Sequence, residues 1–322
     1  MKHSWRYYRN FGLTWIFLFT VIVLGMISPR SWWTVAWAIP AVFLAYYLFS
    51  LYRSVHPSRL LAYFGMTPKA TDLEYEEIVF RSRDGLRLCG WFVQRGNGAT
   101  IILAHGLSGS CSSMIFHAAL LAKDGYSVLM LDLRAHGSSQ GDTSTFGILE
   151  ANDILGAVDY LLTRPGVDPG KIGALGISLG AQAVLRAANQ TDRLKAIVLE
   201  GLGSMSLADH GGRPTTLRRW INYPINWFLY TLGDWMTGIR NPESTSSVLA
   251  KVKSVKMLIS CGRKMEQYFN RRFYDAARQP KVLWEIPKAV HAGGYVQDPK
   301  VYKEKVCRFF GQYLFANASL TE

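Results

Sequence analysis

The 322-residue chain has few cysteines and no pattern that favours metal binding. Cysteines at 89, 111, 261 and 307 form no Cys-x-x-Cys pair, and none stands at a spacing from histidine that suits zinc. A disulfide framework and a structural zinc site are therefore not expected, and no metal or other cofactor is predicted. In a cytoplasmic domain these side chains would be reduced thiols, packed as small apolar groups.

Long blocks of one charge are also missing. The formal net charge is +13, from 36 lysines and arginines against 23 acidic residues, but the basic residues are scattered. Without a basic block or a nucleic-acid motif, nucleic acid is not an expected partner. Attraction to an anionic membrane surface explains the positive excess better, so membrane lipids are a predicted partner.

Charged residues are absent from two apolar stretches near the N-terminus, 11–27 and 32–52. Each is close to the roughly 20 residues that a helix needs to cross a bilayer, and a Ser-Pro-Arg-Ser turn joins them. We expect a hairpin of two transmembrane helices, with a kink at Pro40 in the second. A signal peptide and buried soluble helices are the alternatives. The motif that resembles a cleavage site lies inside the second stretch, and uncharged runs of this length are rare in soluble proteins.

The charges that flank these stretches predict an orientation. Basic residues stand at 2, 6 and 9 before the first stretch and at 53, 59 and 69 after the second, whereas the loop between them has only Arg30. Both ends should therefore face the cytoplasm, in a multi-pass protein of the cell inner membrane. Residues 1–55 are predicted as the anchor, 56–73 as a linker and 74–322 as a cytoplasmic catalytic domain.

From about residue 74 the pattern alternates between strand and helix. Segments 75–82 and 86–93 flank an Arg-Asp-Gly turn and predict a hairpin. Short apolar runs, separated by helical segments, predict further strands at 100–104, 127–131, 171–175, 195–199, 256–259 and 282–286. This order predicts an α/β fold, with a mainly parallel sheet covered by helices on both faces. The aromatic-rich stretch 201–253 is too long for an ordinary connection and predicts a helical cap.

A serine lies between two glycines in the pentapeptide GISLG at 176–180. The run before it predicts a strand, and the alanine- and leucine-rich segment 179–189 predicts a helix. In this context a Gly-x-Ser-x-Gly turn exposes a nucleophilic serine, and the glycines remove Cβ atoms that would collide with the strand or helix. Ser178 is the predicted nucleophile, although a glycine-bounded turn with an incidental serine fits the same pattern.

A serine hydroxyl is a poor nucleophile until a base removes its proton. Of the seven histidines, His291 follows the last predicted strand in a glycine-bearing loop before the final helix. A base on that loop can reach across the sheet edge to Ser178. His291 is therefore the predicted general base.

The base in turn needs a carboxylate that orients it and balances its charge. In the chain order serine, acid, histidine, this group should follow the predicted strand 256–259. Glu266 is the only carboxylate in the loop there and is the predicted acid. An exposed glutamate that favours a helix N-terminus is the alternative role. The other carboxylates between the serine and the histidine include Asp234, Glu243 and Asp275, which lie in the cap or a helix.

A tetrahedral intermediate also needs hydrogen-bond donors for its oxyanion. The backbone amide of Leu179, next to the serine, and that of Leu107, after the strand 100–104, are predicted to supply them. His105 is expected to be structural. In the loop 132–139, three polar side chains are expected to brace the loop rather than form a second site: Asp132, Arg134 and His136.

Taken together, these segments resemble the α/β-hydrolase superfamily from about residue 74 to the end. The motifs AHG at 104–106, DLRAHGSS at 132–139 and GISLG at 176–180 occur in the family order, followed by His291. Two positions depart from the family pattern. Ala135 stands where glycine is usual, and Met265 stands where the acid is usually an aspartate, one residue before Glu266.

The resemblance implies a cofactor-free hydrolase that acts through an acyl-enzyme. The predicted function is membrane-anchored cleavage of a carboxylic ester or thioester in a small lipophilic substrate, such as an acyl lipid, by an esterase or lipase-like serine hydrolase. A serine peptidase or acyl-peptidase of the same fold is one alternative. A catalytically silent hydrolase-fold protein that binds or scaffolds at the membrane is the other.

Overall fold

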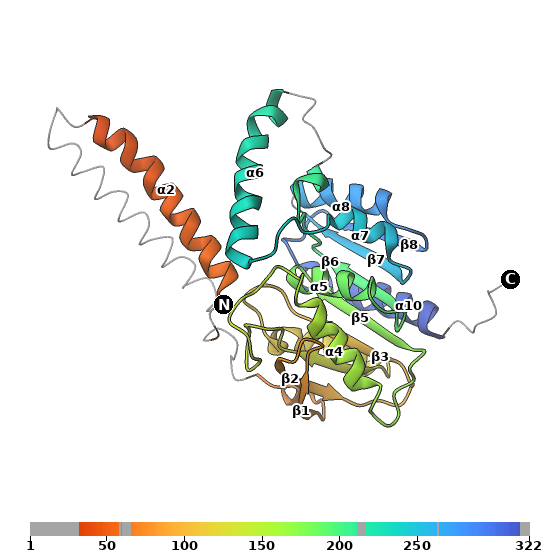
Figure 1. The fold of residues 1–322 in the computed structure, drawn as a ribbon. Helices are drawn as coiled ribbons and strands as arrows, with labels where there is room; N and C mark the ends of the chain where they lie inside the picture. Colours follow the sequence, from red (N-terminus) through yellow and green to blue (C-terminus); the bar gives the residue numbers. More distant parts are fainter. Residues whose placement is uncertain (1–31, 58, 60–65, 211–216, 263, 316–322) are drawn as a thin grey trace. The chain divides into compact units, whose positions relative to one another are not determined.

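The computed structural model describes residues 32–57, 59, 66–210, 217–262 and 264–315 (Figure 1). The chain divides into two compact units, Met1–Ser54 and Val55–Glu322. The described residues of the first unit all lie in the helix α2 (Trp32–Val55), which contains the second predicted apolar stretch. The first predicted stretch lies outside the described residues. Within the described ranges, none of the helices combines the length and the apolar character that a membrane crossing requires, so the transmembrane helix predicted for 32–52 is not confirmed.

The second unit is built on an eight-stranded sheet with the order β1-β2-β4-β3-β5-β6-β7-β8. The antiparallel hairpin predicted at the start of the domain is present, and β2 also pairs antiparallel with β4. Every later pairing is parallel. The strands are β1 (Glu76–Arg81), β2 (Arg87–Val93), β3 (Thr100–Ala104), β4 (Ser127–Leu131), β5 (Ile172–Ile177), β6 (Leu194–Glu200), β7 (Val255–Cys261) and β8 (Lys281–Ile286).

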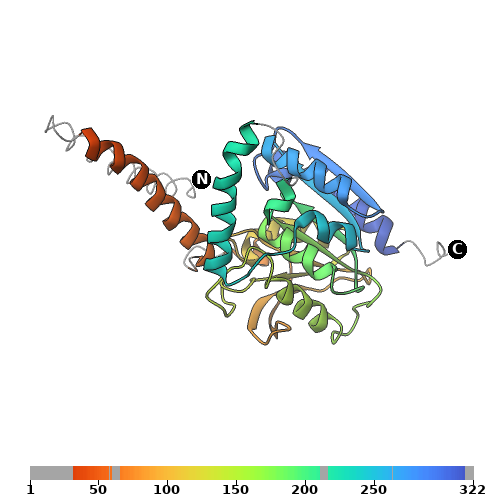
Figure 2. The same cartoon turned by 45° about the horizontal axis from the view of Figure 1, so that its top comes forward.

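Helices cover both faces of this sheet, as Figures 1 and 2 show. Side chains from α4 (Ala151–Leu161), α5 (Leu179–Ala188) and α8 (Lys264–Ala276) form one apolar cluster with the strands. Side chains from α3 (Ile115–Lys123) and α10 (Pro299–Phe315) form the second cluster, on the other face. Every residue of β3, β4 and β5 is buried, which explains why these strands are continuous apolar runs. The predicted mainly parallel α/β sheet is therefore confirmed.

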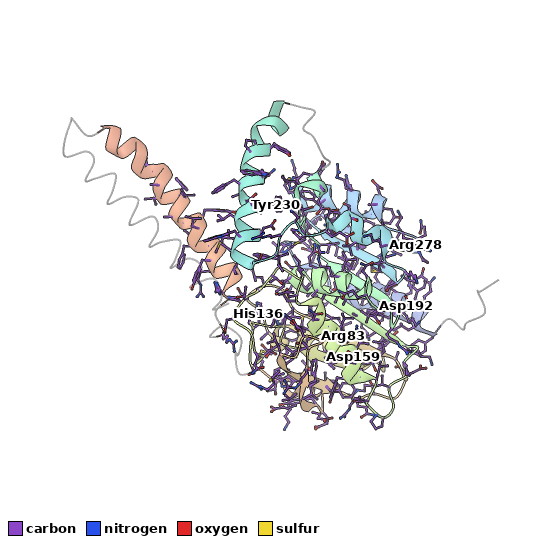
Figure 3. All side chains as sticks on the ribbon, viewed as in Figure 1. Arg83, His136, Asp159, Asp192, Tyr230 and Arg278 are labelled. Carbon is purple, nitrogen blue, oxygen red and sulfur yellow. The ribbon has the colours of Figure 1, made fainter. Side chains whose placement is uncertain are left out.

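The long connection between β6 and β7 contains η4 (Leu207–His210), α6 (Leu217–Thr237) and α7 (Thr245–Lys251). Val248 and Leu249 of α7 belong to the same apolar cluster as α5 and α8. The helix α6 instead exposes aromatic side chains, with Trp227 at 54% and Trp235 at 79% of their full surface. Tyr230 lies on α6 (Figure 3). Its hydroxyl lies 2.9 Å from Nε2 of His210, which ends η4, and this contact holds α6 to the segment after β6.

Two glycines bring three backbones together at the end of β5. A Cβ built on Gly180 would lie 2.2 Å from the carbonyl oxygen of Ala104, at the end of β3. A Cβ built on Gly176 would lie 2.3 Å from the carbonyl oxygen of Gly180. Both distances are far below a normal contact, so only glycine allows α5 to begin this close to β3 and β5. The predicted steric role of the two glycines agrees with this geometry.

We expect Gly180→Ala to lower the free energy of unfolding by about 3 kcal/mol or more, because β3 and α5 must separate to admit the methyl group. Urea denaturation measures the change. Gly233→Ala is the matched control: Gly233 lies inside α6, and a Cβ there meets no described atom within 4 Å. This control should be neutral or raise stability by up to about 1 kcal/mol. Equal effects of the two substitutions would contradict the close approach.

Candidate active site

Ser178 occupies a sharp turn between β5 and α5. Its backbone has φ 53° and ψ −107°, a conformation that side-chain-bearing residues rarely adopt and that costs about 1–3 kcal/mol. The turn is held from both sides, because Ser178 N–H donates to the Glu200 carbonyl at 2.8 Å and the Ser178 carbonyl accepts from Gln182 N–H at 3.2 Å. The strand, turn and helix expected around this serine are therefore present.

The structure brings the three side chains of the predicted site together in one hydrogen-bonded chain. His291 Nε2 lies 3.0 Å from Ser178 Oγ, and His291 Nδ1 lies 2.6 Å from Glu266 Oε2. A carboxylate only accepts, so the proton of the neutral ring belongs on Nδ1, and Nε2 keeps its lone pair for the serine hydroxyl. This is the arrangement that proton removal from a serine requires.

Glu266 is held in place by the backbone around it. Its second oxygen, Oε1, accepts a hydrogen bond from Cys261 N–H at 2.7 Å, at the end of β7. Its side chain is only 7% exposed, whereas that of His291 is 37% exposed. Asn270, one turn further along α8, donates to the Glu266 carbonyl at 2.9 Å and to the Leu202 carbonyl at 3.1 Å. Glu266 is therefore a buried and oriented carboxylate, not a solvent-exposed residue at the start of a helix.

The histidine ring packs against a glycine that follows β6. Gly201 has φ +67°, and a Cβ built on it would lie 2.8 Å from His291 Cε1. Gly262 N–H donates to the Ala289 carbonyl at 2.7 Å, which ties the end of β7 to the loop that carries His291. Close backbone approaches of this kind leave the imidazole little freedom to turn away from Ser178.

Sequence reasoning did not single out Glu200, the last residue of β6. Its side chain is fully buried and accepts from Gly294 N–H at 2.9 Å and from the Tyr302 hydroxyl at 2.7 Å. Cys261 Sγ lies 3.6 Å from it. Burial raises the pKa of Glu200. The only sequence signal is a carboxylate that ends the apolar run KAIVLE.

The role of Glu200 follows from the residues that it holds. Gly294 begins the short helix α9 (Gly294–Gln297), three residues after His291. The carboxylate of Glu200 therefore fixes the chain on the C-terminal side of His291, while its backbone carbonyl fixes Ser178.

The loop after β3 lies beside Ser178. A Cβ built on Gly106 would lie 3.6 Å from Ser178 Cβ. Leu107, the next residue, lines a cavity beside the serine. Leu179 is the first residue of α5, where amide groups have no intrahelical acceptor. Both amides are thus close to the serine, and their role as oxyanion donors stays a prediction.

Two buried histidines hold this loop to the segment after β4. His105 Nε2 accepts from Leu133 N–H at 3.1 Å, so its Nδ1–H donates to the Gly106 carbonyl at 2.8 Å. His136 Nε2 accepts from Ser108 N–H at 3.2 Å. His105 and His136 are therefore structural hydrogen-bonding residues, in agreement with the roles expected for them.

Carboxylates complete the bracing of these loops. Asp132 accepts from Cys111 N–H at 2.7 Å and from Ser138 N–H at 2.9 Å. Arg134 is buried between two carboxylates, Asp153 at 2.7 Å and Asp84 at 2.8 Å. Ala135 has φ +62°, the left-handed conformation that explains why the resembling family favours glycine at this position.

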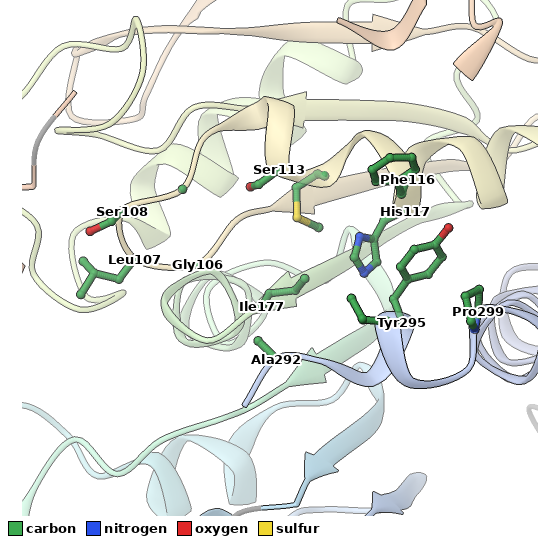
Figure 4. Close-up of a pocket in the computed structure, with 13 residues that line it drawn as sticks. Gly106, Leu107, Ser108, Ser113, Phe116, His117, Ile177, Ala292, Tyr295 and Pro299 are labelled. Atoms are coloured by element: carbon green, nitrogen blue, oxygen red, sulfur yellow. The ribbon is translucent and has the colours of Figure 1, made fainter. Parts of the chain in front are cut away.

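A cavity of about 590 Å³ lies beside the loop after β3, and Figure 4 shows its lining residues. Ser178 and His291 are not among these residues. Ile177 and Ala292, the sequence neighbours of Ser178 and His291, form part of its wall. Most of the lining is apolar or small. The remaining lining residues are Gly106, Leu107, Ser108, Gly109, Ser113, Met114, Phe116, His117, Tyr295, Val296 and Pro299.

No group of three or more histidine, cysteine, aspartate or glutamate side chains in the described segments is arranged to hold a metal ion. The polar groups of the site are instead paired with one another or with backbone amides. The residues present define a hydrogen-bonded serine, histidine and carboxylate at the carboxyl ends of the parallel strands, beside an apolar cavity.

Comparison with known proteins agrees with this fold. The model of the Alpha/beta hydrolase family matches residues 101–306, and the chain belongs to this family. It is 28% identical to the Escherichia coli O157:H7 protein YfhR over 73% of this chain and 80% of that protein. It is 27% identical to the Arabidopsis thaliana alpha/beta hydrolase domain-containing protein WAV2, over 77% of this chain and 82% of that protein.

A solved structure with the same fold is that of the Pyrococcus furiosus esterase Pf2001. The TM-score is 0.65 with 25% sequence identity, and the match covers 81% of this chain and 98% of the esterase. The class of protein that the fold and the family define is a hydrolase.

The buried histidines should make stability fall in acid. Burial, with a smaller contribution from the neighbouring His136, lowers the pKa of His105 from 6.5 to about 4. As the pH falls through 6.5 the unfolded chain takes up this proton first. His105 therefore favours the folded state above pH 6.5, and about 3 kcal/mol of this stability is lost by pH 4. Urea denaturation between pH 7 and 4.5 should show the decline, and His105→Gln should make it less steep, because the other buried histidines remain. An equally steep decline in the variant would contradict the assignment.

Proposed function

We propose that this protein is a serine hydrolase that cleaves carboxylic ester or thioester bonds of lipophilic substrates through an acyl-enzyme intermediate. The observation that carries this proposal is the hydrogen-bonded chain from Ser178 through His291 to Glu266. The distance is 3.0 Å from Ser178 Oγ to His291 Nε2 and 2.6 Å from His291 Nδ1 to Glu266 Oε2. Family membership and the esterase likeness support it.

In the first half of the reaction, His291 Nε2 takes the proton of Ser178 while Oγ attacks the carbonyl carbon of the ester. The imidazolium that forms is balanced by Glu266, whose two oxygens are directed at His291 Nδ1 and at Cys261 N–H. The amides of Leu107 and Leu179 stabilise the negative charge on the carbonyl oxygen. His291 then gives its proton to the departing alcohol or thiol, and the acyl group stays on Ser178.

In the second half, water repeats the attack. His291 removes a proton from the water molecule, hydroxide adds to the acyl carbon, and the proton returns to Ser178 as the acid leaves. The strained turn at Ser178 supports both halves, because it holds Oγ clear of the helix and within reach of His291. The largely apolar cavity beside Ser178 favours a lipophilic substrate.

We also propose that residues 1–55 attach the enzyme to the inner membrane, with the catalytic domain on the cytoplasmic side. Two uncharged stretches, and basic residues on their outer flanks, support this proposal. In the described part of α2, large apolar side chains such as Phe43 and Phe49 are each 58% exposed, which suits a lipid environment. Scattered positive charge favours an anionic leaflet, in which acyl lipids are abundant.

A fluorophosphonate probe tests the nucleophile directly, since it reacts with an activated serine. The intact protein should be labelled at Ser178, and Ser178→Ala should abolish both labelling and ester hydrolysis. Ser113→Ala is the matched control: Ser113 lines the same cavity, and its hydroxyl donates to the Ser110 carbonyl at 2.6 Å. It should keep the labelling. A folded wild-type protein that is not labelled would favour a catalytically silent binding protein.

Glu266→Gln tests the carboxylate. The amide keeps the shape of the side chain but cannot balance the imidazolium, so kcat for a p-nitrophenyl ester should fall about 10²–10⁴-fold. Asp275→Asn removes an exposed carboxylate of the same helix and should leave kcat unchanged. Circular dichroism and the thermal unfolding temperature check that both variants are folded. Turnover near the wild-type value in Glu266→Gln would assign the acid to another residue.

A further inference from the structure

One polar side chain in the cavity beside Ser178 is not explained by the hydrolytic mechanism. His117, on α3, is only 7% exposed and lines the cavity. Figure 4 shows its imidazole directed from α3 toward Tyr295 and Ile177. Nδ1 and Nε2 of His117 are both covered by surrounding atoms, and neither has a hydrogen-bond partner among the residues that the structure describes. A ligand in the cavity therefore reaches one of them only when the ring or its neighbours move. His105 and His136 in the neighbouring loops use both ring nitrogens.

Two aromatic rings lie next to the ring of His117. Its centroid lies 5.0 Å from that of Tyr295 and 5.5 Å from that of Tyr302. Burial lowers the pKa of His117 to about 4, so the ring is neutral at pH 7 and offers one N–H donor and one lone pair. An unpaired polar group at a buried position is unfavourable, so the two ring nitrogens call for a partner that the described residues do not supply.

The rest of the cavity wall limits what can pair with this ring. The lining contains no lysine, arginine, aspartate or glutamate among the described residues. A charged substituent would therefore lose its hydration without gaining an opposite charge. A hydroxyl group both donates and accepts, so it can pair with either ring nitrogen in either tautomer. A chain that is apolar apart from one hydroxyl matches the apolar wall and the single buried imidazole.

We propose that His117 is a specificity residue that binds a hydroxyl group on the chain of the ester that occupies this cavity. The inference rests on the proposed esterase function and adds the class of substrate, a hydroxylated lipophilic ester. The wall of the cavity includes Gly106, and a Cβ built there would lie 3.6 Å from Ser178 Cβ, so a chain that fills the cavity lies close to the serine. The hydroxyl then lies at a fixed number of carbon atoms from the ester carbonyl.

A positional scan of substrates tests this in the wild-type enzyme. The probes are p-nitrophenyl esters of straight-chain acids of one length, unsubstituted or with a hydroxyl at successive carbon atoms. Rates are corrected for uncatalysed hydrolysis and lactone formation. We expect one position to raise kcat/KM at least about tenfold over the unsubstituted ester, because a hydroxyl at that position pairs with the buried imidazole. A scan in which no hydroxyl position exceeds the unsubstituted ester would overturn the inference.

Substitution of His117 separates hydrogen bonding from packing. His117→Phe keeps a flat ring but removes both nitrogens, so the preferred hydroxy ester should lose its advantage while the unsubstituted ester is hydrolysed at least as well. Phe116→Leu is the matched control on the same helix and cavity; it should change the two esters equally and keep the preference. A hydroxyl preference that survives in His117→Phe would overturn the inference.

Two further measurements separate a failure of the His117 proposal from a failure of the proposed esterase function. Fluorophosphonate labelling at Ser178 should be unchanged in His117→Phe, and its thermal unfolding temperature should not fall, since no described hydrogen bond is lost. A lower unfolding temperature with an unaltered substrate preference would assign His117 a purely structural role and overturn the inference. Wild-type protein that neither labels nor hydrolyses any ester overturns the proposed function. Labelling and hydrolysis without a hydroxyl preference overturn only the hydroxyl-binding role proposed for His117.

Discussion

The close backbone approach at the end of β5 is the constraint on which the site depends. Gly176 and Gly180 let α5 begin against β3 and β5, at distances that no side chain permits. This crowding forces Ser178 into a positive-φ turn, which two backbone hydrogen bonds then hold. The burial of β3, β4 and β5 supplies the stability that offsets this local strain. The position of the Ser178 hydroxyl at the sheet edge is thus a consequence of how strand and helix pack.

Three buried carboxylates organise the loops around that serine. Asp132 accepts from amides after β3 and β4, Glu200 from the amide that begins α9, and Glu266 from the amide at the end of β7. Each satisfies backbone groups that would otherwise be buried without a partner. Only Glu266 also reaches His291. The carboxylate that takes part in the proposed chemistry therefore uses the same type of anchor as the carboxylates that only position loops.

The proposed chemistry and the proposed specificity use the two ends of one cavity wall. Near Ser178 the wall is built from backbone, with Gly106 and Leu107 close to the reacting group. Further along, α3 and α9 contribute Phe116, His117 and Tyr295. The bond that breaks is thus recognised by groups that any ester would meet. In this proposal the side chains on α3 and α9 select among esters. A substitution there would change the substrate preference without disturbing the turn at Ser178.

Much of this protein followed from local sequence. The alternation of apolar runs and helical segments determined the class of sheet, and the glycines at 176 and 180 determined the turn, because steric limits act over a few residues. The order of motifs was enough to name Ser178, His291 and Glu266 as partners. What the sequence did not indicate were Glu200 and His117. A carboxylate that ends an apolar strand and a histidine within a helix have no local pattern that distinguishes them from ordinary core residues. Only the tertiary structure shows how Glu200 is anchored and that the ring nitrogens of His117 have no described partner, because burial and hydrogen-bond partners arise when distant segments pack together.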